Sequence, residues 1–181
     1  ITGIDNNKII FLYQGVIQNG RGIKNMIKLL HSFKNACAVI IGGGEYKSEL
    51  IRYIETNKLK NRVFFINTIP YSELLDYTCG ADIGFSLIKP ISKSYINALP
   101  NKIFEYVLAN IPVIASDLPE MKNIFYKYNI GYCVPHNNIK KQIEGVNKIL
   151  TNNFSNVQNI ALKEFVWENQ AEELIKVAIH D

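Results

Sequence analysis

The sequence alternates between short apolar runs and segments in which apolar residues recur with helical spacing. The runs are rich in β-branched and aromatic residues, and such strands are typical of a parallel sheet buried on both faces. Strand and helix in alternation imply right-handed crossovers within one sheet. The sequence therefore predicts an α/β fold: a doubly wound, Rossmann-like parallel sheet of about six strands with helices on both faces. The expected strands are 8–14, 36–41, 62–66, 81–87, 111–115 and 131–134.

Length and charge exclude several classes of protein. The 181 residues, 48% of them hydrophobic, are enough for one core. The formal charge of +4 is spread along the chain, so we expect no nucleic-acid partner. No apolar run reaches the roughly 20 residues that span a bilayer. The three cysteines lie far apart, which suits a reducing compartment, and neither they nor the histidines have the spacing of metal ligands. We expect no metal and no cofactor.

The segment 99–106 has an unusual distribution of charge. Pro100 is well suited to a helix start, and Leu99 before it has no side-chain oxygen to cap the first N–H groups. Lys102 then falls in the first turn, where the helix dipole disfavours a cation. An uncapped helix start beside a lysine is a natural phosphate site. The alternative is that Lys102 is an ordinary exposed residue on a solvated helix face.

The loop after the first expected strand has a second cation at a helix start. Arg21 lies among glycines that allow close approach of the backbone, Gly15 first among them. Arg21 and Lys102 both follow parallel strands, so they are expected at the same edge of the sheet, where they can converge on one diphosphate. The alternative is that Arg21 pairs with a carboxylate on the surface.

Two further features lie at the same edge. Gly43 and Gly44 belong to a glycine-rich turn that matches neither the dinucleotide fingerprint nor the P-loop, so it is a phosphate candidate or simply a tight turn. Glu105 lies on the polar side of the helix that carries Lys102. A carboxylate there can accept hydrogen bonds from the two hydroxyls of a ribose.

These loops resemble the C-terminal half of GT-B glycosyltransferases of family 4 (group 1). The resemblance covers nearly the whole chain, and its matching segments occur in the family's order. It implies that this half binds a nucleotide-diphosphate sugar, often a UDP sugar, while a separate N-terminal half binds the acceptor. The segments are 13–15 with 21–22, 40–44, 63–65, 81–84, 99–106 and 111–120.

The resemblance also implies roles for individual residues. Glu105 is similar to the family glutamate that holds the ribose hydroxyls. Asn101 and Lys102 correspond to residues that offer backbone N–H groups, and Lys102 its ammonium, to the diphosphate. Gly15 is expected to bind the donor phosphates as well. Arg21 resembles a basic residue that stabilises the leaving diphosphate.

The resemblance further implies that the backbone around Thr68 and Ile69 faces the base. The chain departs from the family at two positions. Asn97 stands where a glutamate near the donor sugar is expected, and Val16 stands where many members have an arginine. The catalytic residue therefore stays unassigned, because an amide cannot supply the charge of a carboxylate.

The expected function follows from this resemblance. Residues 1–181 are expected to form the donor-binding domain of a hexosyltransferase, transferring a sugar to a saccharide or lipid-linked acceptor with retention of configuration. The alternatives are a nucleotide-sugar epimerase half and a non-catalytic nucleotide-sugar-binding subunit. The isolated domain is expected to be inactive, and a terminal helix over 164–181 is expected to contact the missing N-terminal domain. We expect a cytoplasmic protein of polysaccharide biosynthesis, with peripheral association at the inner face of the membrane.

Overall fold

The sheet has six strands, all parallel, in the order β3-β2-β1-β4-β5-β6. The computed structural model describes residues 3–5, 7–152, 154, 157–165 and 171. The doubly wound parallel sheet predicted from the apolar runs is confirmed, and the strand bounds differ from the prediction by at most a few residues. The strands are β1 (Ile9–Gln14), β2 (Ala36–Ile41), β3 (Val63–Ile66), β4 (Ile83–Ser86), β5 (Val113–Ser116) and β6 (Gly131–Val134).

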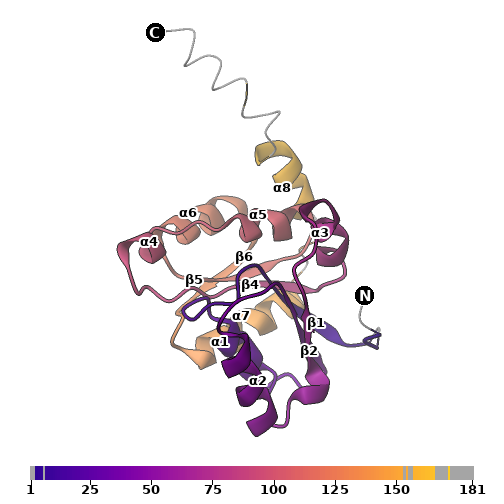
Figure 1. Cartoon of the computed structure of the whole chain (residues 1–181). Coiled ribbons are helices and arrows are strands. Elements are labelled where there is room, and N and C mark those ends of the chain that lie inside the picture. Colours follow the sequence, from indigo (N-terminus) through magenta and orange to yellow (C-terminus); the bar gives the residue numbers. More distant parts are fainter. Residues whose placement is uncertain (1–2, 6, 153, 155–156, 166–170, 172–181) are drawn as a thin grey trace.

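Helices cover both faces of the sheet (Figure 1). Helices α1, α2 and α7 pack on one face, while α3, α5 and α6 pack on the other, and α8 lies against α5. The helices are α1 (Ile23–Leu29), α2 (Lys47–Thr56), α3 (Tyr71–Thr78), α4 (Lys93–Ile96), α5 (Asn101–Leu108), α6 (Pro119–Tyr128), α7 (Ile139–Thr151) and α8 (Val157–Glu164), with a 3-10 turn η1 (Lys60–Arg62).

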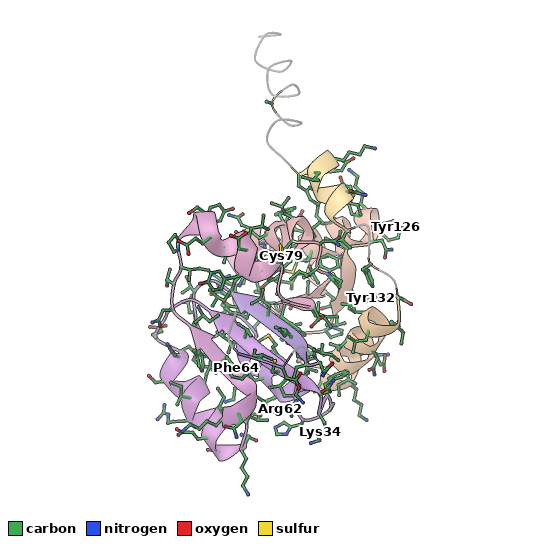
Figure 2. The ribbon with its side chains drawn as sticks, turned by 90° about the vertical axis from the view of Figure 1, so that its right-hand side faces the viewer. Lys34, Arg62, Phe64, Cys79, Tyr126 and Tyr132 are labelled. Carbon is green, nitrogen blue, oxygen red and sulfur yellow. The ribbon has the colours of Figure 1, made fainter. Side chains whose placement is uncertain are left out.

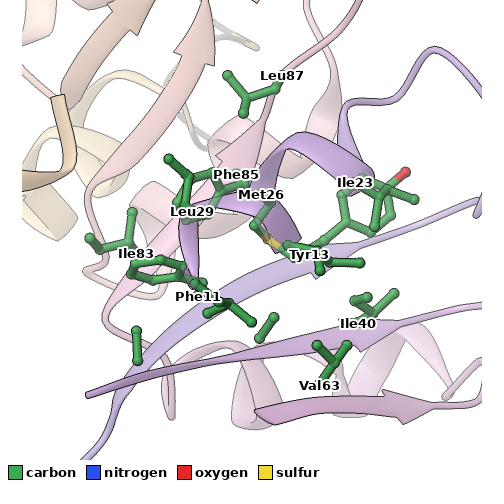
Figure 3. Close-up of a cluster of buried hydrophobic side chains, with 14 of the residues drawn as sticks. Phe11, Tyr13, Ile23, Met26, Leu29, Ile40, Val63, Ile83, Phe85 and Leu87 are labelled. Carbon is green, nitrogen blue, oxygen red and sulfur yellow. The ribbon is translucent and has the colours of Figure 1, made fainter. Parts of the chain in front are cut away.

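Strand β1 contributes to two hydrophobic clusters, one on each face of the sheet. Phe11 and Tyr13 belong to the cluster under α1 and α2, where Figure 3 shows them beside Met26 and Ile40. Leu12, between them, belongs to the cluster under α5 and α6. Successive side chains of a strand point to opposite faces. Burial on both faces is thus the reason that these strands read as continuous apolar runs.

The strand order reverses between β1 and β4. The chain leaves β1 toward β2 and β3 on one side, and leaves β4 toward β5 and β6 on the other. The loops after these two neighbouring strands therefore diverge, and a crevice opens at the carboxyl edge of the sheet. The two cation-bearing segments predicted from the sequence both approach this crevice.

Local structure departs from the sequence prediction at two places. Arg62, expected in a strand, ends the turn η1 at the β3 edge of the sheet, near Phe64 (Figure 2). Its Nε and Nη1 donate to the carbonyls of Ala36 and Leu30, each at 2.9 Å. Helix α4 was not expected; Ser92 caps its N-terminus, and the Ser92 hydroxyl accepts a hydrogen bond from the N–H of Tyr95.

The expected terminal helix over 164–181 falls mostly on 166–170 and 172–181, outside the described residues, so its contact with another domain stays a prediction. Within the described residues, no helix is long and apolar enough to cross a membrane. The same residues contain no cluster of His, Cys, Asp and Glu that could hold a metal ion.

Candidate functional site

A cavity of about 490 Å³ lies at the carboxyl edge of the sheet, between the end of β1 and the start of α5. Gly15, Arg21, Asn101 and Lys102, predicted to bind phosphate, belong to its wall together with Glu105. The phosphate candidates Gly43 and Gly44 do not line this cavity. The lining residues are Tyr13, Gln14, Gly15, Val16, Arg21, Leu74, Leu99, Pro100, Asn101, Lys102 and Glu105.

The N-terminus of α5 opens into this cavity without a side-chain cap. The capping residue is Pro100, no side chain accepts a hydrogen bond from the first turn, and the first turn has no acidic residue. Helix geometry leaves the N–H groups of Asn101 and Lys102 without an intrahelical acceptor. The positive end of the helix dipole and these donors therefore face the same space, as in sites that bind anions.

Lys102 is half-buried in the cavity wall rather than exposed on a solvated face. Its Nζ lies 3.7 Å from the centre of the Tyr13 ring. The Tyr13 hydroxyl in turn donates a hydrogen bond of 2.6 Å to the carbonyl of Val16. Burial, together with the positive charge of Arg21, lowers the pKa of Lys102 to about 7, although Glu105 acts in the opposite direction. The site thus holds a lysine that loses its proton more readily than an ordinary lysine as the pH rises above neutrality.

Arg21 is held by an aromatic ring rather than by a carboxylate. Its guanidinium carbon lies 4.7 Å from the centre of the Tyr95 ring. Among the described residues, the ion pairs are Lys24 with Glu49 and Lys141 with Glu144, so Arg21 has no acidic partner there. Stacking on a ring leaves the N–H donors in the plane of the guanidinium available to a bidentate anion.

Glu105 is hydrogen-bonded to a buried residue of β1. Gln14 Nε2 donates a hydrogen bond of 2.5 Å to Glu105 Oε2. Gln14 is 2% exposed, and its Oε1 lies 2.9 Å from the hydroxyl of Thr78 at the end of α3. The carboxylate expected to contact ribose is therefore fixed in place by an amide that the sequence prediction left without a role.

A second cavity, of about 210 Å³, adjoins the first beyond Gly15 and Val16. It brings Gly43 together with Thr68 and Ile69, the residues predicted to face a base. The two cavities share Gly15, Val16 and Leu74 in their lining, so they lie next to one another.

Gly44 serves the packing of the turn and does not line either cavity. A Cβ atom on Gly44 would lie 2.2 Å from the carbonyl oxygen of Ile17, and one on Gly42 would lie 2.2 Å from the carbonyl oxygen of Gly15. Both glycines have positive φ. For Gly44 the structure favours the tight-turn interpretation over the phosphate one.

Asn97 is exposed and lies at the end of α4, outside the lining of both cavities. The structure therefore does not bring it together with the other predicted site residues.

Sequence reasoning missed Gln14, Tyr13 and Tyr95 as site residues. Gln14 could have been noticed as a polar residue at the end of an apolar strand, whereas no feature of the neighbouring sequence distinguishes Tyr95.

The fold and this edge cavity define a class of protein: the chain forms a Rossmann-like half of a GT-B fold. Sucrose-phosphate synthase from Thermosynechococcus elongatus has a similar fold, with a TM-score of 0.83 and 17% identity over 98% of this chain and 46% of that one. HepE of Anabaena, solved in complex with UDP, gives a TM-score of 0.77 and 20% identity over 94% of this chain and 49% of that one.

The family model for glycosyl transferases group 1 matches residues 1–166, and the chain belongs to this family. An uncharacterized glycosyltransferase of Methanocaldococcus jannaschii, MJ1059, is 24% identical over 180 residues, which are 94% of this chain and 38% of that protein. The chain thus spans less than half the length of each of these three proteins.

Proposed function

We propose that this chain is the donor-binding half of a glycosyltransferase that uses a nucleotide-diphosphate sugar, with a UDP sugar as the donor. The observation that carries the proposal is the convergence of Arg21, Lys102, the uncapped start of α5 and Glu105 on one cavity. Family membership and the UDP complex of HepE support it. The nucleotide sugar is the substrate, and the proposal includes no separate cofactor.

In this proposal each part of the donor binds a different part of these two neighbouring cavities. The diphosphate lies against the N–H groups of Asn101 and Lys102 and between the side chains of Lys102 and Arg21, close to Gly15. The ribose hydroxyls donate to Glu105. The base occupies the second cavity, along the backbone of Thr68 and Ile69.

The chemistry assigned to these residues is stabilisation of a leaving group. When the bond between the anomeric carbon and the phosphate oxygen breaks, its electron pair stays on the diphosphate. Arg21, Lys102 and the N-terminus of α5 surround the place where this charge develops, and preorganised donors of this kind lower the barrier. Transfer to a saccharide or lipid-linked acceptor, with retention, requires an acceptor-binding half, so the proposal assigns no transfer activity to this chain alone.

Two wider proposals rest on the resemblance rather than on the site. They are a cytoplasmic location with peripheral membrane association, and a role in polysaccharide biosynthesis. The alternative of a non-catalytic binding subunit predicts the same nucleotide binding, and the position of Asn97 outside the cavity is the observation in its favour.

Calorimetry with the purified chain tests the proposal. We expect UDP to bind more tightly than GDP and ADP, because the proposed donor is a UDP sugar. Absence of binding by all three nucleotides would overturn the proposed donor site. Transfer assays on this chain combined with an acceptor-binding half, comparing the native residue with Asn97→Ala, then separate a catalytic half from a passive subunit.

A further inference from the structure

Three side chains from different elements form a hydrogen-bonded chain behind the cavity. Thr78 is the last residue of α3, Gln14 is the last residue of β1, and Glu105 lies on α5. Thr78 is fully buried and Gln14 is 2% exposed. A buried amide is costly unless its polar atoms are paired, and here both ends of the Gln14 amide have partners. This arrangement ties the position of Glu105 to two residues of the interior.

The direction of the hydrogen bonds follows from the chemistry of Glu105. A carboxylate only accepts, so Gln14 must present its NH2 group to Glu105 and its carbonyl oxygen to Thr78. The hydroxyl of Thr78 has one hydrogen and two acceptors within reach: Gln14 Oε1 at 2.9 Å and the Leu74 carbonyl at 2.7 Å. The single hydrogen is shared between these two acceptors, and its interaction with Gln14 Oε1 favours the amide orientation that Glu105 requires.

The backbone of Gln14 adds a second link between β1 and α5. The Gln14 N–H donates a hydrogen bond of 3.1 Å to the hydroxyl of Tyr106, the neighbour of Glu105. Tyr106 is fully buried, and its hydroxyl lies 3.3 Å from the carbonyl of Leu12. The segment of α5 that carries Glu105 is thus held to β1 by two hydrogen bonds from Gln14, one from its backbone N–H to Tyr106 and one from its side chain to Glu105.

We propose that Gln14 is a positioning residue for ribose recognition. By occupying Oε2 of Glu105, it fixes the plane of the carboxylate, and Oε1 then accepts a hydrogen bond from a ribose hydroxyl. Gln14 acts through Glu105, and Thr78 orients Gln14 in turn. This inference rests on the proposed function, because it requires a ribonucleotide in the cavity.

The measurement is the ratio of the affinities for UDP and 2′-deoxy-UDP, determined by calorimetry. Base and diphosphate contacts are common to both probes and cancel in the ratio. We expect the native chain to prefer UDP by at least about tenfold, the effect of one hydrogen bond to a charged group. Glu105→Gln should bring the ratio close to one. Gln14→Met, which keeps the side-chain length without a donor, should lower the ratio at least about threefold.

A matched pair of variants at Thr78 tests the hydrogen-bonded chain from Thr78 through Gln14 to Glu105, and Thr78 does not line the proposed diphosphate cavity. Thr78→Val keeps the shape of the side chain and removes the hydroxyl, so it should lower the ratio, whereas Thr78→Ser should preserve it. If thermal unfolding shows that Gln14→Met does not fold, this pair still tests whether Gln14 positions Glu105 for ribose recognition. A purely structural role for Gln14 would lower the melting temperature and leave the ratio unchanged.

The outcomes separate the two proposals. No binding of either probe would overturn the proposed function of this site. Binding of both probes with equal affinity would leave nucleotide binding in place but remove the ribose role of Glu105, and with it the inference on Gln14. A preference for UDP that Glu105→Gln abolishes, and that both Gln14→Met and Thr78→Val leave intact, would overturn the inference on Gln14 alone.

Discussion

The ammonium of Lys102 lies 3.7 Å from the centre of the Tyr13 ring, on the wall of the cavity at the carboxyl edge of the sheet. The ring face replaces part of the water that an ammonium ordinarily keeps, and cation–π attraction compensates for some of this loss. Burial and the nearby Arg21 still lower the pKa of Lys102 to about 7. The protonation of Lys102, which the proposed function places beside the diphosphate, therefore changes with pH near neutrality.

UDP binding should weaken as the pH rises from 7 to 9. The pKa of Lys102 lies at about 7, so the side chain carries its proton below this pH and loses it above. Losing one charged contact to the diphosphate should cost about tenfold in affinity over this range, as measured by calorimetry. Lys102→Arg, which stays charged throughout, should flatten the profile. A native profile as flat as that of Lys102→Arg would contradict this prediction.

Glu105→Ala should weaken UDP binding more than tenfold, because it removes a charge-assisted hydrogen bond to ribose. The same titration with Glu144→Ala provides the control, since Glu144 is a surface glutamate paired with Lys141. We expect this control to bind UDP like the native chain. An affinity of Glu105→Ala close to that of the native chain would refute the ribose assignment.

Tyr95→Leu should weaken UDP binding about two- to fivefold. The ring of Tyr95 supports the Arg21 guanidinium at 4.7 Å, and a cation–π contact at a partly exposed site contributes roughly 0.5–1 kcal/mol. Tyr95→Phe keeps the ring and should retain the native affinity. Equal loss in both variants would show that the hydroxyl, rather than the ring, supports the site.

Gly44→Ala should destabilise the fold, whereas Gly43→Ala should not. A Cβ on Gly44 would meet the Ile17 backbone at 2.2 Å, and its φ of +154° disfavours other residues. A Cβ on Gly43 would lie 3.6 Å from its nearest neighbour, Thr68 Oγ1. Chemical denaturation should show a loss of roughly 1–3 kcal/mol for Gly44→Ala and less than about 0.5 kcal/mol for Gly43→Ala. Equal stability of the two variants would contradict the packing role of Gly44.

Asn97→Ala should leave UDP affinity unchanged within about twofold. Asn97 is exposed and does not line the cavities assigned to the nucleotide, and surface changes of this kind have small effects. Calorimetry on the native chain and on the variant provides the comparison. A large loss of UDP affinity would place Asn97 in the nucleotide site after all.

The periodicity of the sequence was sufficient to predict the sheet, because strands buried on both faces must be apolar throughout. It was also sufficient to place Arg21 and Lys102 at one edge, since the loops after parallel strands share that edge. Helix α4 was missed because its four residues are too few to show a helical period. The role of Gly44 depends on the backbone of Ile17, which sequence spacing does not locate.

The sequence by itself determined the strands and the longer helices, their alternation and the charges at two helix starts, because these depend on neighbours within a few residues. Only the tertiary structure decided which side chains meet. Gln14 and Glu105 are 91 residues apart and touch because β4 pairs beside β1 and α5 packs against both. The pairing of Lys102 with Tyr13 and of Arg21 with Tyr95 has the same origin. Burial, and with it the lowered pKa of Lys102, exists only once the strands and helices are packed together.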